Sequence, residues 1–216
     1  MKSLINNLRF LEIRDFVNES PGYEKILVTD SGDLIFQTDI SSIFEIHENL
    51  AGVVEQVSPA IEMLVNKNDI DNYEEIMAIL EGERLINVGF ILFSRKTFLE
   101  VVELMEKVAK NLNAWGIDTV VPNYYAYKNG FHVLHEKYNF IPTTARKKYK
   151  VKNGKFYLVE NDNLEMISVV HNAGRHRILR PIMNFGYGED HNIPKPFTVF
   201  ILRTFYSLLS FLRSKK

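Results

Sequence analysis

The stretch Lys-Ile-Leu-Val-Thr-Asp-Ser-Gly-Asp, residues 25–33, decides the fold of this chain. Residues 25–29 are apolar and partly β-branched, which predicts a short buried strand. The turn Asp30-Ser31-Gly32-Asp33 breaks that strand, and residues 34–36 resume an extended pattern. In α/β sheets, ligands bind beyond the carboxyl ends of the strands. The two carboxylates therefore lie where a ligand is expected.

Helical and extended patterns alternate on both sides of this stretch. An amphipathic helix is expected over residues 3–19, and Ser94 is expected to cap a helix whose apolar face begins at Phe98. Asn153-Gly154, between two alternating arms, predicts a β-hairpin over residues 148–160. Further strands are expected over residues 51–57, 85–93 and 166–170, with a weaker helical signal over residues 58–83. This order predicts an α/β protein with a mixed β-sheet flanked by helices, the hairpin being the reason for a mixed sheet.

Residues 1–195 are expected to form one domain, followed by an amphipathic, basic helix over residues 196–216. The apolar run in this tail is too short and too interrupted to span a membrane, for which about 20 apolar residues are needed. Such a helix fits a membrane interface, with its basic residues near anionic head groups. It equally fits docking on its own domain or on a second subunit, and the sequence leaves these alternatives open.

The composition excludes several classes of protein. The chain has 216 residues, 46% of them apolar, no cysteine and a formal net charge of -1. The 15 Phe and 10 Tyr exclude a disordered chain, and the absence of cysteine excludes a disulfide-stapled scaffold. Without excess positive charge, nucleic acid is not an expected partner. Asn and Arg interrupt residues 4–9, so no signal peptide is expected and the expected location is the cytoplasm, with peripheral attachment to the inner face of the membrane as an addition.

The first candidate site is the acidic turn. Asp30 and Asp33 are three residues apart across a glycine and can face one point, as Mg²⁺ or Mn²⁺ requires of its oxygen ligands. A plain surface turn is the alternative, because Asp, Ser and Gly are common in turns.

The second candidate lies at the end of the 166–170 strand. His171 can bind a transition-type cation there, and Arg175 and Arg177 can clamp a phosphate. The alternative is a hydrogen-bonded histidine followed by a solvated basic loop.

Two weaker candidates lie between these sites. In Asn87-Val88-Gly89, the glycine within a strand marks a place where a ligand or another backbone can approach closely, and the asparagine can bind a sugar hydroxyl. The alternative is that the glycine forms a β-bulge. Asp118 is expected either to cap the helix that follows it or to act as a base toward an acceptor. The basic run that begins at Arg146 and continues through the hairpin can steer an anionic substrate, or it is a solvated face.

The order of these motifs carries more information than each motif alone. Five motifs follow one another along the chain: Arg9-Phe10, the acidic turn with Leu34-Ile35-Phe36-Gln37, Asn87-Val88-Gly89-Phe90, Gly116-Ile117-Asp118 with Asn123, and residues 169–175. This set resembles the latter part of the GT-A-fold nucleotide-sugar glycosyltransferases. It is most similar to bacterial enzymes that act on surface polysaccharide or lipopolysaccharide.

The resemblance implies a role for each candidate residue. It places Asp30, Asp33 and His171 at a Mn²⁺ or Mg²⁺ ion, Asn87 and Gly89 at the donor sugar, and Asp118 on the acceptor side. The arginines at 175 and 177 would add to the stabilisation of the departing diphosphate. The implied activity is transfer of a sugar from a nucleotide-sugar donor, such as a UDP-sugar, to a glycan or a lipid-linked acceptor.

The sequence departs from the family pattern at three points. The acidic motif is Asp-x-x-Asp rather than Asp-x-Asp, and Thr119 follows Asp118 where the family has Gln. Only 29 residues precede Asp30, and they contain no strand for the base and ribose. The expectation is a GT-A-like (partial Rossmann-like) core, acting with a complementing N-terminal chain or as a homo-oligomer. The alternative is a non-catalytic remnant that serves as an interaction module.

Overall fold

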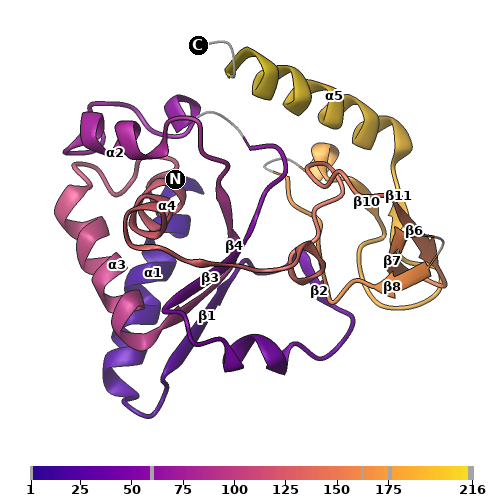
Figure 1. The fold of residues 1–216 in the computed structure, drawn as a ribbon, viewed down its shortest axis with the longest axis horizontal. Helices are drawn as coiled ribbons and strands as arrows, with labels where there is room; N and C mark the ends of the chain where they lie inside the picture. Colours follow the sequence, from indigo (N-terminus) through magenta and orange to yellow (C-terminus); the bar gives the residue numbers. More distant parts are fainter. Residues whose placement is uncertain (1, 59–60, 162, 175–176, 214–216) are drawn as a thin grey trace. The chain divides into compact units, whose positions relative to one another are not determined.

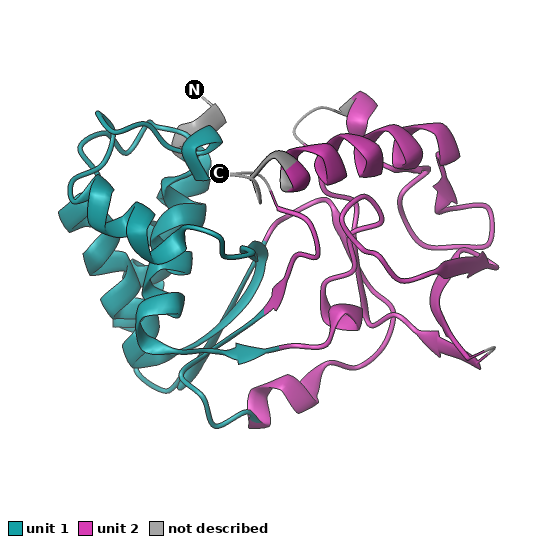
Figure 2. Ribbon diagram, turned by 45° about the horizontal axis from the view of Figure 1, so that its top comes forward, with its two compact units in different colours: residues 1–29, 46–52, 59–133 teal, residues 30–45, 53–58, 134–216 magenta. Residues whose placement is uncertain are grey.

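The computed structural model describes residues 2–58, 61–161, 163–174 and 177–213. The chain divides into two compact units (Figure 2). Unit 1 consists of residues 1–29, 46–52 and 59–133, and unit 2 of residues 30–45, 53–58 and 134–216. Helices and strands alternate within the chain, so the α/β class is confirmed. The expected domain boundary after residue 195 stays a prediction.

Unit 1 is built on a four-stranded sheet of order β1-β4-β3-β5. Its strands are β1 (Lys25–Thr29), β4 (Ile86–Ser94), β3 (Leu50–Val54) and β5 (His132–Val133). β1 pairs antiparallel with β4, whereas β3 pairs parallel with β5. The sheet is therefore mixed as predicted, but for a different reason, because the 148–160 hairpin belongs to another sheet.

Four α-helices accompany this sheet: α1 (Lys2–Glu19), α2 (Tyr73–Leu80), α3 (Arg95–Val108) and α4 (Ile117–Asn129). In Figure 1, α1, α3 and α4 form a layer beside the sheet. Phe10 of α1 stacks on Phe98 of α3, and Phe93 of β4 meets Phe98 edge to face. All three rings are fully buried, and each contributes about 2–3 kcal/mol through burial of its apolar surface. These rings hold the helix layer on the sheet.

The helix starts of unit 1 confirm one prediction and correct two. Ser94 caps α3, its hydroxyl accepting from the Thr97 amide at 3.2 Å. Asp118 is not a cap, because Gly116, at φ +85°, occupies that position of α4. A Cβ at Gly116 would lie 2.3 Å from the Leu64 carbonyl oxygen, so only glycine fits there. Over residues 58–83 the described helical structure is limited to the 3₁₀ turn Ile61–Met63 and α2, since the polar, Asn- and Asp-rich residues between them favour turns.

A surface network joins α2 to α4. The Tyr124 hydroxyl donates to Glu75 at 2.5 Å, and the Lys128 ammonium lies 2.9 Å from the same carboxylate oxygen. Hydrogen bonds from Tyr124 and Lys128 lower the pKa of Glu75. The network therefore contributes only while this carboxylate is ionised.

Unit 2 contains small antiparallel sheets. β2 (Leu34–Phe36) pairs with β9 (Val169–His171), and β6 (Tyr149–Lys152), β7 (Lys155–Glu160) and β8 (Asn163–Met166) form a three-stranded sheet. β10 (Ile182–Met183) pairs with β11 (Ile193–Pro194), and α5 (Pro196–Arg213) follows. The expected 166–170 strand is divided between β8 and β9, because Ser168 donates instead to the Lys137 carbonyl.

The predicted hairpin is confirmed. Asn153 (φ 49°) and Gly154 (φ 70°) form the two-residue turn between β6 and β7, as expected for a turn in which both central residues have positive φ. A Cβ at Gly154 would lie 2.0 Å from the Gly188 carbonyl oxygen. Tyr149 of β6 packs between Phe140 and Phe156 in the core of this unit.

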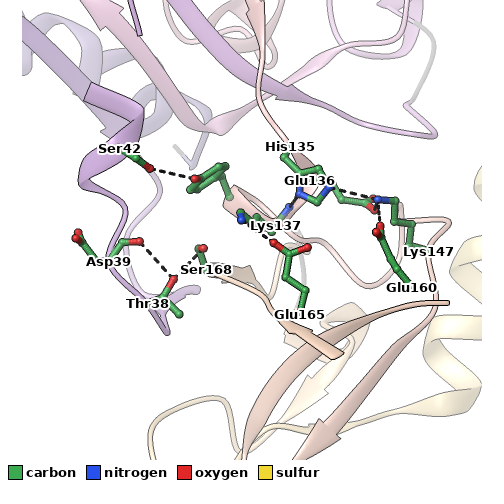
Figure 3. A network of polar contacts seen from close by, with 11 residues as sticks. Thr38, Asp39, Ser42, His135, Glu136, Lys137, Lys147, Glu160, Glu165 and Ser168 are labelled. Carbon is green, nitrogen blue, oxygen red and sulfur yellow. Dashed lines mark hydrogen bonds and ion pairs between the residues drawn. The ribbon is translucent and has the colours of Figure 1, made fainter. Parts of the chain in front are cut away.

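A polar network positions the segment that leads to Phe140 (Figure 3). Lys137, in the 3₁₀ turn Glu136–Tyr138, pairs with Glu165 of β8 at 2.6 Å, and Lys147 pairs with Glu136 at 3.3 Å and also with Glu160. The hydrogen bond with Glu165 raises the pKa of Lys137. The pairs with Glu165 and Glu160 are partly exposed and contribute little stability individually, whereas the Glu136 side chain is 10% exposed. The main effect of the three pairs is to fix this segment against the three-stranded sheet.

None of the helices in the described part of the chain is sufficiently long and apolar to cross a membrane.

Candidate metal centre

The pairing of β2 with β9 brings the predicted metal ligands of unit 2 together. Leu34 is the register partner of His171, and the Asn172 amide donates to the Asp33 carbonyl at 2.8 Å. Asp33 directly precedes β2 and His171 ends β9, so the antiparallel register places both residues at one end of the pair. Gly32, at φ +81°, makes the turn that brings Asp30 back to the same point.

The three side chains form one cluster of possible metal ligands. One ligand atom from each of Asp30, Asp33 and His171 lies within 4.8 Å of the others. Nε2 of His171 lies 3.5 Å from Oδ2 of Asp30 and 3.9 Å from Oδ1 of Asp33. His171 and Asp33 are buried, whereas the Asp30 side chain is 35% exposed. The cluster is therefore anchored in the protein and open to solvent on the Asp30 side.

The histidine is held in a defined orientation. Its Nδ1–H donates to Oδ1 of Asn139 at 3.0 Å, and its backbone amide donates to the Phe140 carbonyl at 2.9 Å. When the ring is neutral with its proton on Nδ1, the lone pair of Nε2 faces the two carboxylates. Within the described residues, Nε2 of His171 has no hydrogen-bond partner although it is buried. A buried nitrogen without such a partner is costly unless another ligand satisfies it.

Arg180 adds a cation at the edge of the cluster. Its guanidinium lies 3.4 Å from Oδ2 of Asp33, on the carboxylate whose other oxygen faces His171. The buried Asn172 side chain fixes the segment after Arg180 by bonding both the amide and the carbonyl of Ile182. Among the described side chains of the cluster, and with the imidazole ring uncharged, two carboxylates and one guanidinium carry a net negative charge, which favours a divalent cation.

The donor set fits a particular class of metal ion. Carboxylate oxygens suit Mg²⁺ and Mn²⁺, and an imidazole nitrogen suits transition metals, so the combination favours Mn²⁺. Asn139 is the outer hydrogen-bond partner that metal-bound histidines usually have. Three protein ligands leave coordination positions for oxygen atoms of a substrate.

The predicted site residues Asn87, Gly89 and Asp118 belong to unit 1 and form a cluster of their own. Asp118 is buried, and its carboxylate lies 3.3 Å from the guanidinium of Arg9, which also donates to the Val88 carbonyl at 3.4 Å. The Asn87 side chain accepts from the Gly89 amide at 3.1 Å. The structure thus connects the Asn87–Gly89 segment to Asp118 through Arg9, a residue that the sequence analysis noted only as part of the resemblance.

For two of the predicted site residues, the structure does not describe the whole residue or its side chain. Arg175 is outside the described residues, and so is the side chain of Arg177. Sequence reasoning also missed Asn139 and Arg180, and Asn172 was noted only within the 169–175 motif of the resemblance, without a role. No local pattern marks them, because their contacts with the site join segments far apart in the chain or depend on how a loop folds.

Comparisons with known proteins give little further information. No family model matches the chain, and no curated protein matches it. Among solved structures, the chain is similar to the apo structure of WbbM, a bifunctional glycosyltransferase, with 16% sequence identity and a TM-score of 0.44. The match covers 73% of this chain and 30% of that protein, so the chain corresponds to less than a third of its length. A likeness of this degree decides neither a ligand nor an activity.

Proposed function

We propose that the protein is a divalent-metal-dependent glycosyltransferase that moves a sugar from a nucleotide-sugar donor to a glycan or a lipid-linked acceptor. The observation that carries the proposal is the cluster of Asp30, Asp33 and His171, with its bare Nε2 facing two carboxylates. The order of motifs in the sequence supports the same assignment.

The chemistry of sugar transfer matches this cluster. Positive charge develops on the sugar and negative charge on the departing diphosphate, and a bound divalent cation supplies stabilisation of that negative charge. Asp30 and Asp33 would hold the ion through oxygen atoms, and His171 would hold it through Nε2. Arg180, beside Asp33, offers a second positive charge to a phosphate oxygen.

The remaining roles follow the resemblance. Asn87 and Gly89 would bind the donor sugar, and Asp118 would lie on the acceptor side. The ion pair between Asp118 and Arg9 supports a positioned carboxylate rather than a loose surface group.

Calorimetric titration with Mn²⁺, followed by UDP-sugars, tests the proposal. The wild-type chain is expected to bind Mn²⁺ saturably and to bind UDP-sugars more tightly when Mn²⁺ is present. The double substitution Asp30→Asn and Asp33→Asn preserves side-chain volume and is expected to abolish Mn²⁺ binding. Asp190→Asn, at an exposed carboxylate of the same unit, is the matched control and is expected to bind as the wild type does.

The same titration separates the proposal from the alternative of a non-catalytic interaction module. A folded wild-type chain that binds no Mn²⁺, or a double variant that binds it unchanged, would contradict a metal-dependent enzyme. The cluster would then be a polar network that only stabilises the end of the β2–β9 pair.

A further inference from the structure

Two polar side chains of helix α5 make hydrogen bonds to its own unit. Nε of Arg203 donates to the Pro142 carbonyl at 2.9 Å, and the Arg203 guanidinium lies 5.9 Å from the centroid of the Tyr149 ring. Arg146 donates to the Ser207 hydroxyl at 2.8 Å. Arg203 and Ser207 are four residues apart and so share one helix face. Val199 is 8% exposed and Leu202, Tyr206 and Leu209 are partly buried, so the inward face combines these polar contacts with apolar packing.

The outward side of α5 is apolar. Its large apolar side chains are between 45% and 77% exposed, and they are Phe197, Phe200, Ile201, Phe205, Leu208 and Phe211. The spacing of three and four residues places them in one stripe along the helix. At 1.5 Å per residue, the 18-residue helix is about 27 Å long. Helix α5 therefore carries large apolar side chains on its outward side as well, where an ordinary surface helix carries charged or polar ones.

A basic groove runs beside this helix. It has a volume of about 600 Å³, and Arg146 and Arg203 line it together with Tyr149, Val151 and Phe200. A neighbouring hollow of about 290 Å³ adds Lys148 and Lys150. Among the described residues that line these two spaces there is no Asp or Glu.

The charges in this groove are not neutralised from within. Partial burial lowers the pKa of the Arg203 guanidinium; Tyr149 acts in the opposite direction, and the nearby charge of Arg146 again lowers this pKa. The excess of basic over acidic residues also holds for the C-terminal segment of the sequence, since residues 195–216 contain five basic residues and no acidic residue. An anion placed in the groove would relieve the repulsion between the two arginines.

We propose that α5 and the groove beside it bind the surface of an anionic phospholipid membrane. The apolar stripe enters the boundary between head groups and acyl chains, and Arg146 and Arg203 contact lipid phosphates. The combination of an exposed Phe-rich stripe with uncompensated basic charge is the pattern of a helix that lies in a membrane interface. A protein partner or a second copy of the chain could cover the apolar stripe, but it would also have to place acidic groups in the groove to neutralise the arginines.

Flotation with lipid vesicles tests the apolar stripe. The full chain is expected to float with vesicles of phosphatidylcholine mixed with phosphatidylglycerol, and much less with phosphatidylcholine alone. The triple substitution Phe197→Ser, Phe200→Ser and Leu208→Ser is expected to lower the partition coefficient more than about tenfold, because three large apolar side chains no longer enter the lipid. Ile178→Ser changes a side chain that is 79% exposed outside α5 and is the matched control.

A second pair of variants tests the charge. Arg146→Gln with Arg203→Gln is expected to lower binding to anionic vesicles about fivefold for each charge removed. Arg203 also donates to the Pro142 carbonyl, so its substitution can disturb the fold as well as the charge. A second double variant, Lys148→Gln with Lys150→Gln, removes two charges from exposed side chains only. Lys96→Gln, on an exposed lysine of unit 1, is the control. Added salt is expected to weaken the binding of the wild-type chain, since it screens exposed charges.

Three results would overturn the proposal. The first is a wild-type chain that floats with neither kind of vesicle, and the second is a triple variant that floats as the wild type does. The third is a lipid-free dimer, measured by light scattering, that the triple variant abolishes, because the stripe would then bind a second copy. The Asp30→Asn and Asp33→Asn variant should float normally, so membrane binding and metal binding are tested separately.

Discussion

Removing the hydrogen-bond acceptor behind His171 is the most informative perturbation of the candidate metal centre. Asn139→Leu keeps a side chain of similar size but removes the oxygen that accepts from Nδ1 at 3.0 Å. His171 is 1% exposed, so water cannot replace that acceptor. The imidazole then loses the contact that fixes both its proton on Nδ1 and its ring orientation.

The magnitude follows from this geometry. A buried N–H left without an acceptor costs about 1–3 kcal/mol. Loss of an outer partner of a metal-bound histidine lowers metal affinity about 10- to 100-fold, which corresponds to about 1.4–2.8 kcal/mol. The two ranges agree, so we expect Asn139→Leu to weaken Mn²⁺ binding by one to two orders of magnitude and to lower the free energy of unfolding by a similar energy.

Calorimetry with Mn²⁺ and urea unfolding of the metal-free chain measure the two effects. Asn139→Asp is the control, because it keeps an acceptor oxygen at the same place and is expected to retain Mn²⁺ affinity. An Asn139→Leu variant that folds, loses stability and still binds Mn²⁺ as tightly as the wild type would refute the role of His171 as a metal ligand.

Three further predictions concern stability. Gly154→Ala is expected to lower the free energy of unfolding by at least about 1–2 kcal/mol in urea, because the turn needs a left-handed residue and the new Cβ meets a carbonyl oxygen. The pKa of Glu75 is lowered, so the stabilisation from its network is present above the usual pKa of a glutamate and is lost as the pH falls through the lowered value; Glu75→Gln should remove this acid-side decrease from the stability profile. Arg9→Gln takes the cation away from buried Asp118 and is expected to cost about 3 kcal/mol, whereas Arg14→Gln, in a more exposed ion pair, should cost less than about 1 kcal/mol by chemical unfolding.

The local elements were predictable because local patterns specify them. Positive φ at Asn153 and Gly154 makes the hairpin turn, and the Ser94 hydroxyl satisfies a free amide at the start of α3. The start of α4 was misplaced for a reason that is not local. Gly116 is required by its close approach to the Leu64 carbonyl, which no helix-capping pattern reveals.

The sequence by itself determined the α/β class, the strand that ends at the acidic turn, the hairpin and the amphipathic character of α5. It also named Asp30, Asp33 and His171, because carboxylates and histidines at strand ends are readable from composition and spacing. Only the tertiary structure decided which groups surround them. The β2–β9 register joins residues more than a hundred positions apart, and Asn139, Asn172 and Arg180 enter through contacts that no local pattern encodes. The same holds for α5, since periodicity gives a helix two faces and only packing decides which face turns outward.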